Sequence, residues 1–99
     1  MRIVQISEEA VDDLLEICGF LGKSAAGEEF LASVLRAREN LKLFPFMGTT
    51  EHPLAPGRRV LKLRSGYLLS YEVKSDADAT EQRVILRRIF HGARQPGSL

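Results

Sequence analysis

The sequence has few of the residues that stabilise small proteins through disulfides or metal sites. Its 99 residues include one cysteine, no tryptophan and two histidines. The single Cys18 excludes an internal disulfide, and one thiol with two imidazoles is too small a set for a zinc site. No apolar run approaches the roughly 18 residues that cross a bilayer, and the N-terminus lacks the apolar stretch of a secretory signal. We therefore expect a cytoplasmic protein that uses no metal or other cofactor and does not enter the membrane.

The length predicts one domain over residues 1–99, with residues 92–99 as a flexible C-terminal tail. The composition, 44% hydrophobic and 27% charged residues, is that of an ordinary soluble domain. A domain of this size buries only about 60 to 65% of the surface that its unfolded chain exposes. We therefore expect a marginal core that depends on a partner.

The overall charge of +1 hides a difference between the two halves of the chain. Residues 1–57 carry five basic and nine acidic residues, a net charge of −4. Residues 58–99 carry nine basic and four acidic residues, a net charge of +5. This asymmetry predicts an anionic or acidic partner for one face of the protein only.

Two amphipathic helices are predicted in the first half. Ser7 precedes an acidic first turn and an apolar stripe of three- and four-residue spacing that ends at Gly22. Ser24 begins a second such pattern, which ends before Pro45 because the residue preceding a proline is pushed out of the helical region. The acidic residues of the first helix, Asp12, Asp13 and Glu16, are interpreted as a solvated face.

Four β-prone runs accompany the helices. A short run at residues 3–6 precedes the first helix, and a β-branched run at 83–90 follows the last polar loop. Between them, residues 59–64 and 67–73 flank Ser65-Gly66, which we interpret as a two-residue hairpin turn.

That turn fixes the expected register of the hairpin. Lys62 is then opposite Leu69, and Arg59 is opposite Glu72 in a cross-strand ion pair. In this register Lys62 and Arg64 share one face of the sheet.

Basic side chains are frequent on the predicted strands and just after them: Lys62, Arg64, Arg83, Arg87, Arg88, His91 and Arg94. If they converge on one face and one edge of a small sheet, they could hold phosphates. The alternative is that they make the sheet edge soluble and pair with Glu72, Asp76 and Glu81. No phosphate loop, nucleophile elbow or metal-ligand spacing is present, so an ordinary hydrolase has no sequence support. Metal-free RNA cleavage needs a base, cations and a proton donor, roles that Lys, Arg, His and Tyr can fill.

Four phrases that span nearly the whole chain resemble the RelE/ParE toxin superfamily of bacterial type II toxin–antitoxin modules. VQISEEAVDDLLEI resembles its strand-to-helix entry, LKLFPFMG its helix-ending phrase, RRVLKLRSGYLLSYEV its central hairpin and VILRRIFHGARQ its closing strand. The resemblance implies an α+β fold, in which an N-terminal strand and a two-helix hairpin pack on a small twisted antiparallel sheet of about four strands. It also implies a groove for a segment of a cognate antitoxin.

The superfamily contains ribosome-dependent mRNA endonucleases of the RelE type and DNA gyrase poisons of the ParE type. The ending IFHGARQ resembles the ParE type, whereas RelE-type nucleases place a catalytic tyrosine near this end, and no tyrosine follows Tyr71 here. The resemblance therefore implies a ParE-like toxin, of the kind found in plasmid stabilisation modules, that inhibits DNA gyrase by binding and not by catalysis. It implies no sequence-specific DNA binding by this chain alone.

The resemblance also suggests where the partners bind. Target contacts are assigned to Arg87, His91 and Arg94, with Lys62 and Arg64 as a second set. Antitoxin contacts are assigned to an apolar rim of Val11, Leu15, Phe30 and Val34. Two alternatives stay open: a RelE-like endonuclease that cleaves mRNA on the ribosome with Lys62, Arg64, Arg87 and His91, and a non-toxic homologue that only binds an antitoxin.

Overall fold

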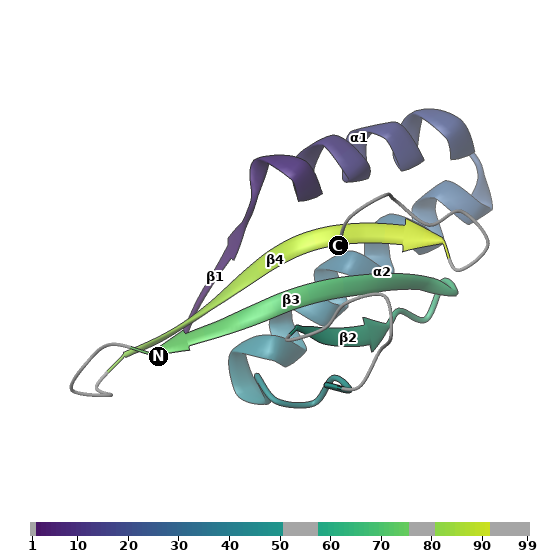
Figure 1. The fold of residues 1–99 in the computed structure, drawn as a ribbon. Helices are drawn as coiled ribbons and strands as arrows, with labels where there is room; N and C mark the ends of the chain where they lie inside the picture. Colours follow the sequence, from purple (N-terminus) through teal and green to yellow (C-terminus); the bar gives the residue numbers. More distant parts are fainter. Residues whose placement is uncertain (1, 51–57, 76–80, 92–99) are drawn as a thin grey trace.

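The computed structural model describes residues 2–50, 58–75 and 81–91. Figure 1 shows two helices packed on one four-stranded sheet. In chain order the elements are β1 (Ile3–Ile6), α1 (Glu8–Leu21), α2 (Ala25–Leu43), β2 (Arg59–Lys62), β3 (Tyr67–Ser75) and β4 (Gln82–His91). Neither helix is long and apolar enough to cross a membrane, a statement that covers the described ranges only.

The helices begin and end where the capping residues predict. The Ser7 hydroxyl accepts a hydrogen bond from the Ala10 N–H, and the Ser24 hydroxyl accepts one from the Gly27 N–H, as hydroxyl N-caps do. Gly22 ends α1 with a φ of 65°, a left-handed conformation that glycine adopts without strain. The predicted helical hairpin is thus confirmed.

The sheet has the strand order β1-β4-β3-β2. It is a mixed sheet, whereas the sequence predicted an antiparallel one. β2, β3 and β4 are antiparallel neighbours, but β1 pairs in parallel with β4, with Val4 opposite Val84. In the sequence, both helices, β2 and β3 come between β1 and β4. The two strands are therefore joined by a long crossover and not by a hairpin, which allows them to be parallel. The α+β class and the four strands are confirmed.

The β2–β3 hairpin differs from the expected register by one residue. The Leu63 N–H donates to the Tyr67 carbonyl, and the Gly66 N–H donates to the Leu63 carbonyl. The loop therefore has three residues, 64–66, with Gly66 at a φ of 94°, a common hairpin loop that adds a bulge. Lys62 is consequently opposite Leu68, and Arg59 is opposite Tyr71, so the predicted pair of Arg59 with Glu72 is wrong.

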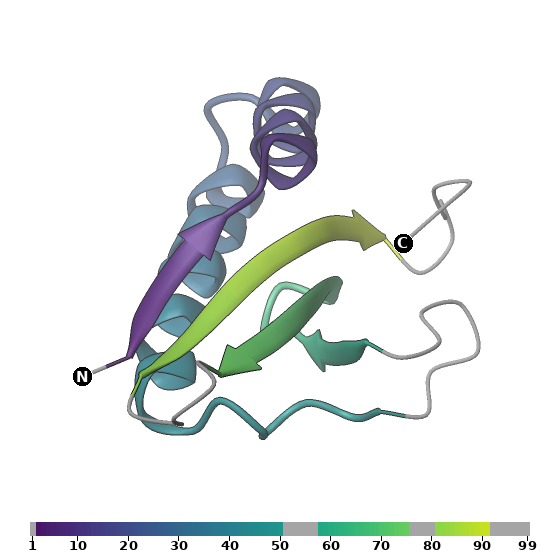
Figure 2. The ribbon, with the colours of Figure 1, turned by 60° about the vertical axis from the view of Figure 1, so that its left-hand side comes forward.

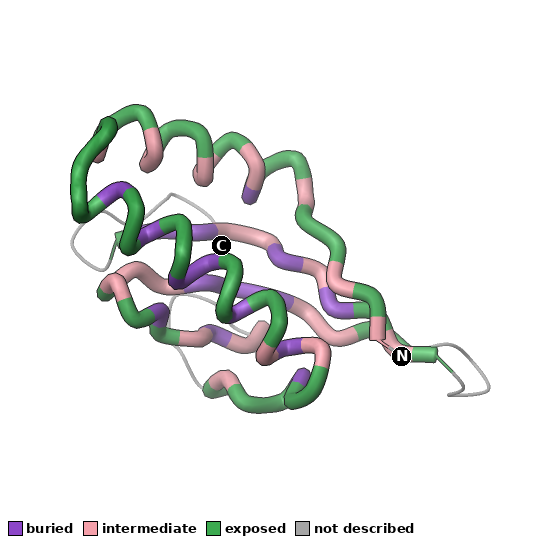
Figure 3. Tube along the Cα trace, turned by 180° about the vertical axis from the view of Figure 1, so that it is seen from behind, coloured by how far each residue is buried: buried purple, intermediate pink, exposed green. Residues whose placement is uncertain are grey.

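The core lies between α2 and one face of the sheet, while α1 lies beside the second half of β4 (Figure 2). Phe30 and Leu41 of α2 are fully buried against Leu69 and Tyr71 of β3 and Val84 of β4. α1 contributes a single fully buried residue, Ala10. Figure 3 shows the consequence, an outward surface of both helices that is largely exposed.

Candidate partner-binding surfaces

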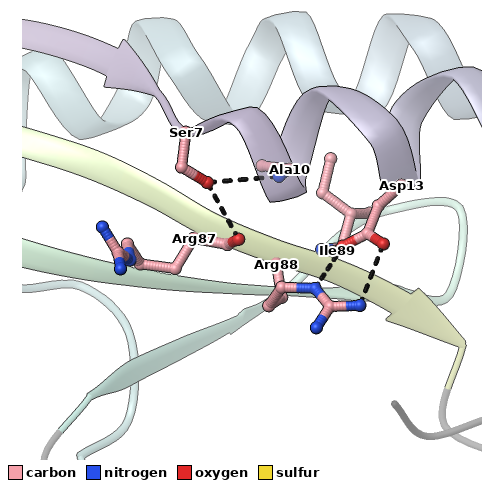
Figure 4. Close-up of polar contacts among 6 residues, drawn as sticks. All are labelled: Ser7, Ala10, Asp13, Arg87, Arg88 and Ile89. Carbon is pink, nitrogen blue, oxygen red and sulfur yellow. Dashed lines mark hydrogen bonds and ion pairs between the residues drawn. The ribbon is translucent and has the colours of Figure 1, made fainter. Parts of the chain in front are cut away.

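Arg87 is the extra residue of a β-bulge in β4. Tyr71 pairs with Leu86 and Ser70 pairs with Arg88, which leaves Arg87 unopposed between them. Its carbonyl accepts a hydrogen bond from the Ser7 hydroxyl, 3.0 Å away, so the α1 N-cap also anchors the bulge (Figure 4). Bulges re-aim side chains and are over-represented next to functional sites.

The Arg87 side chain is held by β3. Its Nε lies 3.1 Å from Oε1 of Glu72, and about a quarter to a third of each side chain is exposed. Glu72 is thus the partner of Arg87 and not of Arg59. A target that contacts Arg87 has to accept this ion pair as it stands or compete with Glu72.

A second basic residue of β4, Arg88, is bound to α1. Its Nε and Nη2 donate to the two carboxylate oxygens of Asp13 at 2.7 and 3.1 Å, and the Ile89 N–H donates to the same carboxylate at 3.0 Å (Figure 4). The hydrogen bond to Asp13 raises the pKa of the Arg88 guanidinium. Asp13 therefore does not belong to the solvated face proposed for Asp12, Asp13 and Glu16.

The sheet has a basic end, defined by Lys62, Arg64 and His91. It is the end at which β2 and β4 finish and β3 begins. Lys62 and Arg64 are exposed, and Arg64 lies in the three-residue loop. The His91 ring meets the Tyr67 ring edge-on with centroids 5.2 Å apart. Arg94, the remaining predicted target contact, lies outside the described residues.

The predicted cations do not all converge. Arg83 is opposite Lys74 at the other end of β4, so like charges face one another there. Along β3, Ser70 and Glu72 lie between Lys74 and the basic end of the sheet. The structure thus places Lys62, Arg64 and His91 at the same end of the sheet, Arg87 partway along β4 and Arg83 at the other end.

The expected apolar rim needs a correction. Phe30 and Val34 are buried in the core, so they cannot contact a partner in this structure. The next residues along α2, Leu31 and Leu35, are exposed instead and lie one helical turn apart. On α1, Leu15 is exposed and Val11 is half-buried, so both stay available.

The two helices come together only near their connecting turn. A side chain at Gly27 would collide with the Gly22 carbonyl, so a glycine is required where α2 passes the end of α1. From there the helices diverge (Figure 3). We define the helix surface as the exposed or half-buried residues Val11, Leu15, Leu31 and Leu35.

No group of three or more potential metal ligands occurs in residues 2–50, 58–75 and 81–91. Both tyrosines have structural environments: the Tyr71 phenol is buried and accepts a hydrogen bond from the Gly48 N–H at 2.9 Å. Tyr67 packs edge-on between the Phe30 and His91 rings.

Comparison with known proteins agrees with this description. The fold is a small α+β domain with cations at one end of its sheet and exposed apolar side chains on its helices. The chain belongs to the family of ParE toxins of type II toxin–antitoxin systems, parDE, whose family model matches residues 4–96. It is accordingly the toxin component of such a module, and the family implies a cognate antitoxin partner.

A solved structure supports the fold. The chain is similar to a chain of the chromosomal ParDE toxin–antitoxin system from P. aeruginosa, with a TM-score of 0.60 and 21% sequence identity. The match covers 92% of this chain and 96% of the other. No curated protein matches the sequence.

Proposed function

We propose that this toxin inhibits DNA gyrase by binding to it through the basic end of the sheet, and that the antitoxin prevents this by occupying the helix surface. The observation that carries the proposal is the position of Lys62, Arg64 and His91 at one end of the sheet. Lys62 and Arg64 are exposed, and neither forms an ion pair within the described part of the chain. Their charges are thus available to an anionic partner surface.

Binding is favoured over cleavage by the environments of the candidate acids and bases. A metal-free nuclease needs a general base and a proton donor within hydrogen-bond reach of one phosphate. Tyr71 is buried, and its hydroxyl is engaged by Gly48. Tyr67 packs against Phe30 and His91. Tyr71 is therefore not available as an acid partner for His91.

The target-binding half of the proposal is tested with the double variant His91→Ala/Arg94→Ala. We expect it to stay folded, to relieve growth inhibition and to lose inhibition of gyrase supercoiling with purified enzyme. Arg83→Ala is the matched control, since it removes an exposed cation at the other end of β4. Full inhibition by a folded double variant, or equal loss in the control, would refute the assignment.

The antitoxin half is tested on the helix surface with Leu31→Ser/Leu35→Ser. Because both side chains are exposed, the folded toxin should tolerate the change, whereas the complex loses apolar contacts. We expect toxicity that co-expressed antitoxin no longer suppresses. An antitoxin that still neutralises this variant would place its contacts elsewhere.

The endonuclease is kept as a second candidate because lysine, arginine and histidine occur at one end of the sheet, and such groups can stabilise and protonate a cleaving phosphate. Mapping mRNA 5′ ends after induction separates the two. New ends in translated messages within minutes would favour cleavage on the ribosome, and intact messages would favour gyrase. A chain that binds the antitoxin yet leaves growth unaffected would support the non-toxic alternative.

A further inference from the structure

The turn after α2 exposes an unusual run of large apolar side chains. Leu43, Phe44, Phe46 and Met47 are 66%, 63%, 53% and 46% exposed. We call these four residues the turn patch. They are four of five consecutive residues, and the fifth, Pro45, is buried. Contiguous exposed apolar groups of this kind mark interaction sites more often than single exposed side chains do.

The backbone beneath the turn patch is fixed. The Phe44 N–H donates to the Asn40 carbonyl at 2.8 Å, and the Gly48 N–H donates to the Tyr71 hydroxyl at 2.9 Å. Thr49 forms a two-way backbone bridge with Val60 at 2.8 and 2.9 Å. A partner that binds here meets a surface whose backbone is already ordered, so little entropy is lost on binding.

Arg59 completes the turn patch from β2. Its Nη1 donates to the carbonyls of Phe46 and Gly48 at 3.1 and 3.0 Å, and its guanidinium carbon lies 4.8 Å from the centroid of the Phe46 ring. The cation thus fixes an exposed aromatic ring face-on, an arrangement suited to a contact that combines apolar area with positive charge.

The surroundings of the turn patch are basic. Arg2 donates to the Lys42 carbonyl at 3.0 Å, which brings a second cation to the end of α2. Lys42 itself is ion-paired with Glu39. The first helical turn of α1 is acidic, and α1 lies at the opposite side of the molecule from the turn after α2, as Figures 1 and 2 both show. The turn patch therefore complements a segment with apolar and acidic side chains.

We propose that the turn patch is a second docking site for the antitoxin, which places there a segment that carries apolar side chains beside carboxylates. This inference rests on the proposed neutralisation by an antitoxin and adds to it a contact away from the helix surface. Two linked contacts on one partner multiply the affinity of either alone when the linker spans both sites.

A second copy of this chain fits the turn patch less well. Two-fold pairing of the patch would place the Arg59 cations of both copies within one interface. Like charges at such a contact are unfavourable. An acidic partner removes this repulsion, and for that reason the proposal names the antitoxin.

The test uses the protein that restores growth to cells expressing this chain, purified with the chain as their complex. Phe44→Ala/Phe46→Ala truncates two exposed rings of the turn patch, and Phe20→Ala is the control because it removes a more exposed ring from α1. We expect about a tenfold or greater loss of affinity in the double variant, as for truncated interface anchors, and none in the control. We also expect protection of residues 43–48 from hydrogen exchange in the wild-type complex.

Each outcome has a distinct meaning. Unchanged affinity in a folded double variant, with no protection of residues 43–48, overturns the turn-patch proposal while the neutralisation itself stands. If no co-expressed protein restores growth, or if the chain does not arrest growth, the proposed function fails first. A double variant that loses toxicity but keeps its antitoxin affinity assigns the patch to the target and overturns the proposal. Concentration-dependent dimerisation of the free chain that the double variant abolishes would assign it to a second copy and also overturn the proposal.

Discussion

The carboxylate of Asp13 joins α1 to β4 by binding both the Arg88 guanidinium and the Ile89 backbone N–H. β1 pairs with the edge of β4 only as far as Leu86. Beyond Leu86, the Ser7 hydroxyl bonds the Arg87 carbonyl and the Asp13 carboxylate bonds the Ile89 N–H. One serine and one aspartate thus satisfy backbone groups along a strand edge that would otherwise be open to pairing with another chain.

Asp13→Ala should destabilise the protein by about 2 to 3 kcal/mol, because it leaves the Ile89 N–H and the partly buried Arg88 charge without this partner. Asp12→Ala is the control, since Asp12 is exposed on the same helix turn. Urea unfolding followed by circular dichroism measures both. Equal stabilities of the two variants would show that the Asp13 contacts add nothing.

Tyr71→Phe should lower the free energy of unfolding by about 1 kcal/mol near neutral pH, because the Gly48 N–H loses its acceptor. The difference from the wild type should shrink as the pH rises above about 10. Burial raises the pKa of the Tyr71 phenol from its usual 10.0. The phenol therefore ionises at a lower pH in the unfolded chain than in the folded one, and the folded wild type loses stability at alkaline pH. Unfolding curves at pH 7 to 11 test this; a constant difference would contradict it.

Gly48→Ala should destabilise the protein by about 1 to 3 kcal/mol through overpacking. A Cβ there would lie 2.8 Å from the Tyr71 hydroxyl and 3.0 Å from the Val60 carbonyl. Gly19→Ala is the contrasting change, since a Cβ at that helical position meets nothing within 4 Å and alanine favours helices by about 1 kcal/mol. Thermal unfolding should therefore move in opposite directions for the two variants, and a shift in the same direction would argue against the tight turn.

Glu72→Gln should strengthen target binding if Arg87 is a contact, because the substitution removes the carboxylate that competes for its guanidinium. Arg87→Ala should weaken it by about tenfold, the size expected for one charged contact. Inhibition of gyrase supercoiling as a function of toxin concentration compares the variants. If both changes leave the half-inhibitory concentration unaltered, Arg87 serves only the sheet.

Local signals in the sequence predicted the local structure. Ser7, Gly22 and Ser24 mark helix ends because capping depends on neighbouring backbone groups. The predicted hairpin register is wrong by one residue because Ser65-Gly66 suits either a two- or a three-residue loop. In the structure the hydrogen bonds of Leu63 close the three-residue loop. The sequence alone does not distinguish these loops.

Long-range features were not predictable in the same way. The parallel pairing of β1 with β4 depends on residues about 80 positions apart. The bulge at Arg87 and the partnership of Asp13 with Arg88 depend on that pairing. Phe30 and Val34 were predicted to be exposed, but the sheet buries them and leaves their neighbours Leu31 and Leu35 exposed.

The central claim, that this toxin acts on DNA gyrase by binding, is tested most directly by pulse-labelling after induction of the chain alone in bacteria. DNA synthesis and protein synthesis are followed over the first minutes. Inhibition of gyrase should stop DNA synthesis while translation continues. Early arrest of translation with continuing DNA synthesis would contradict it and favour the endonuclease.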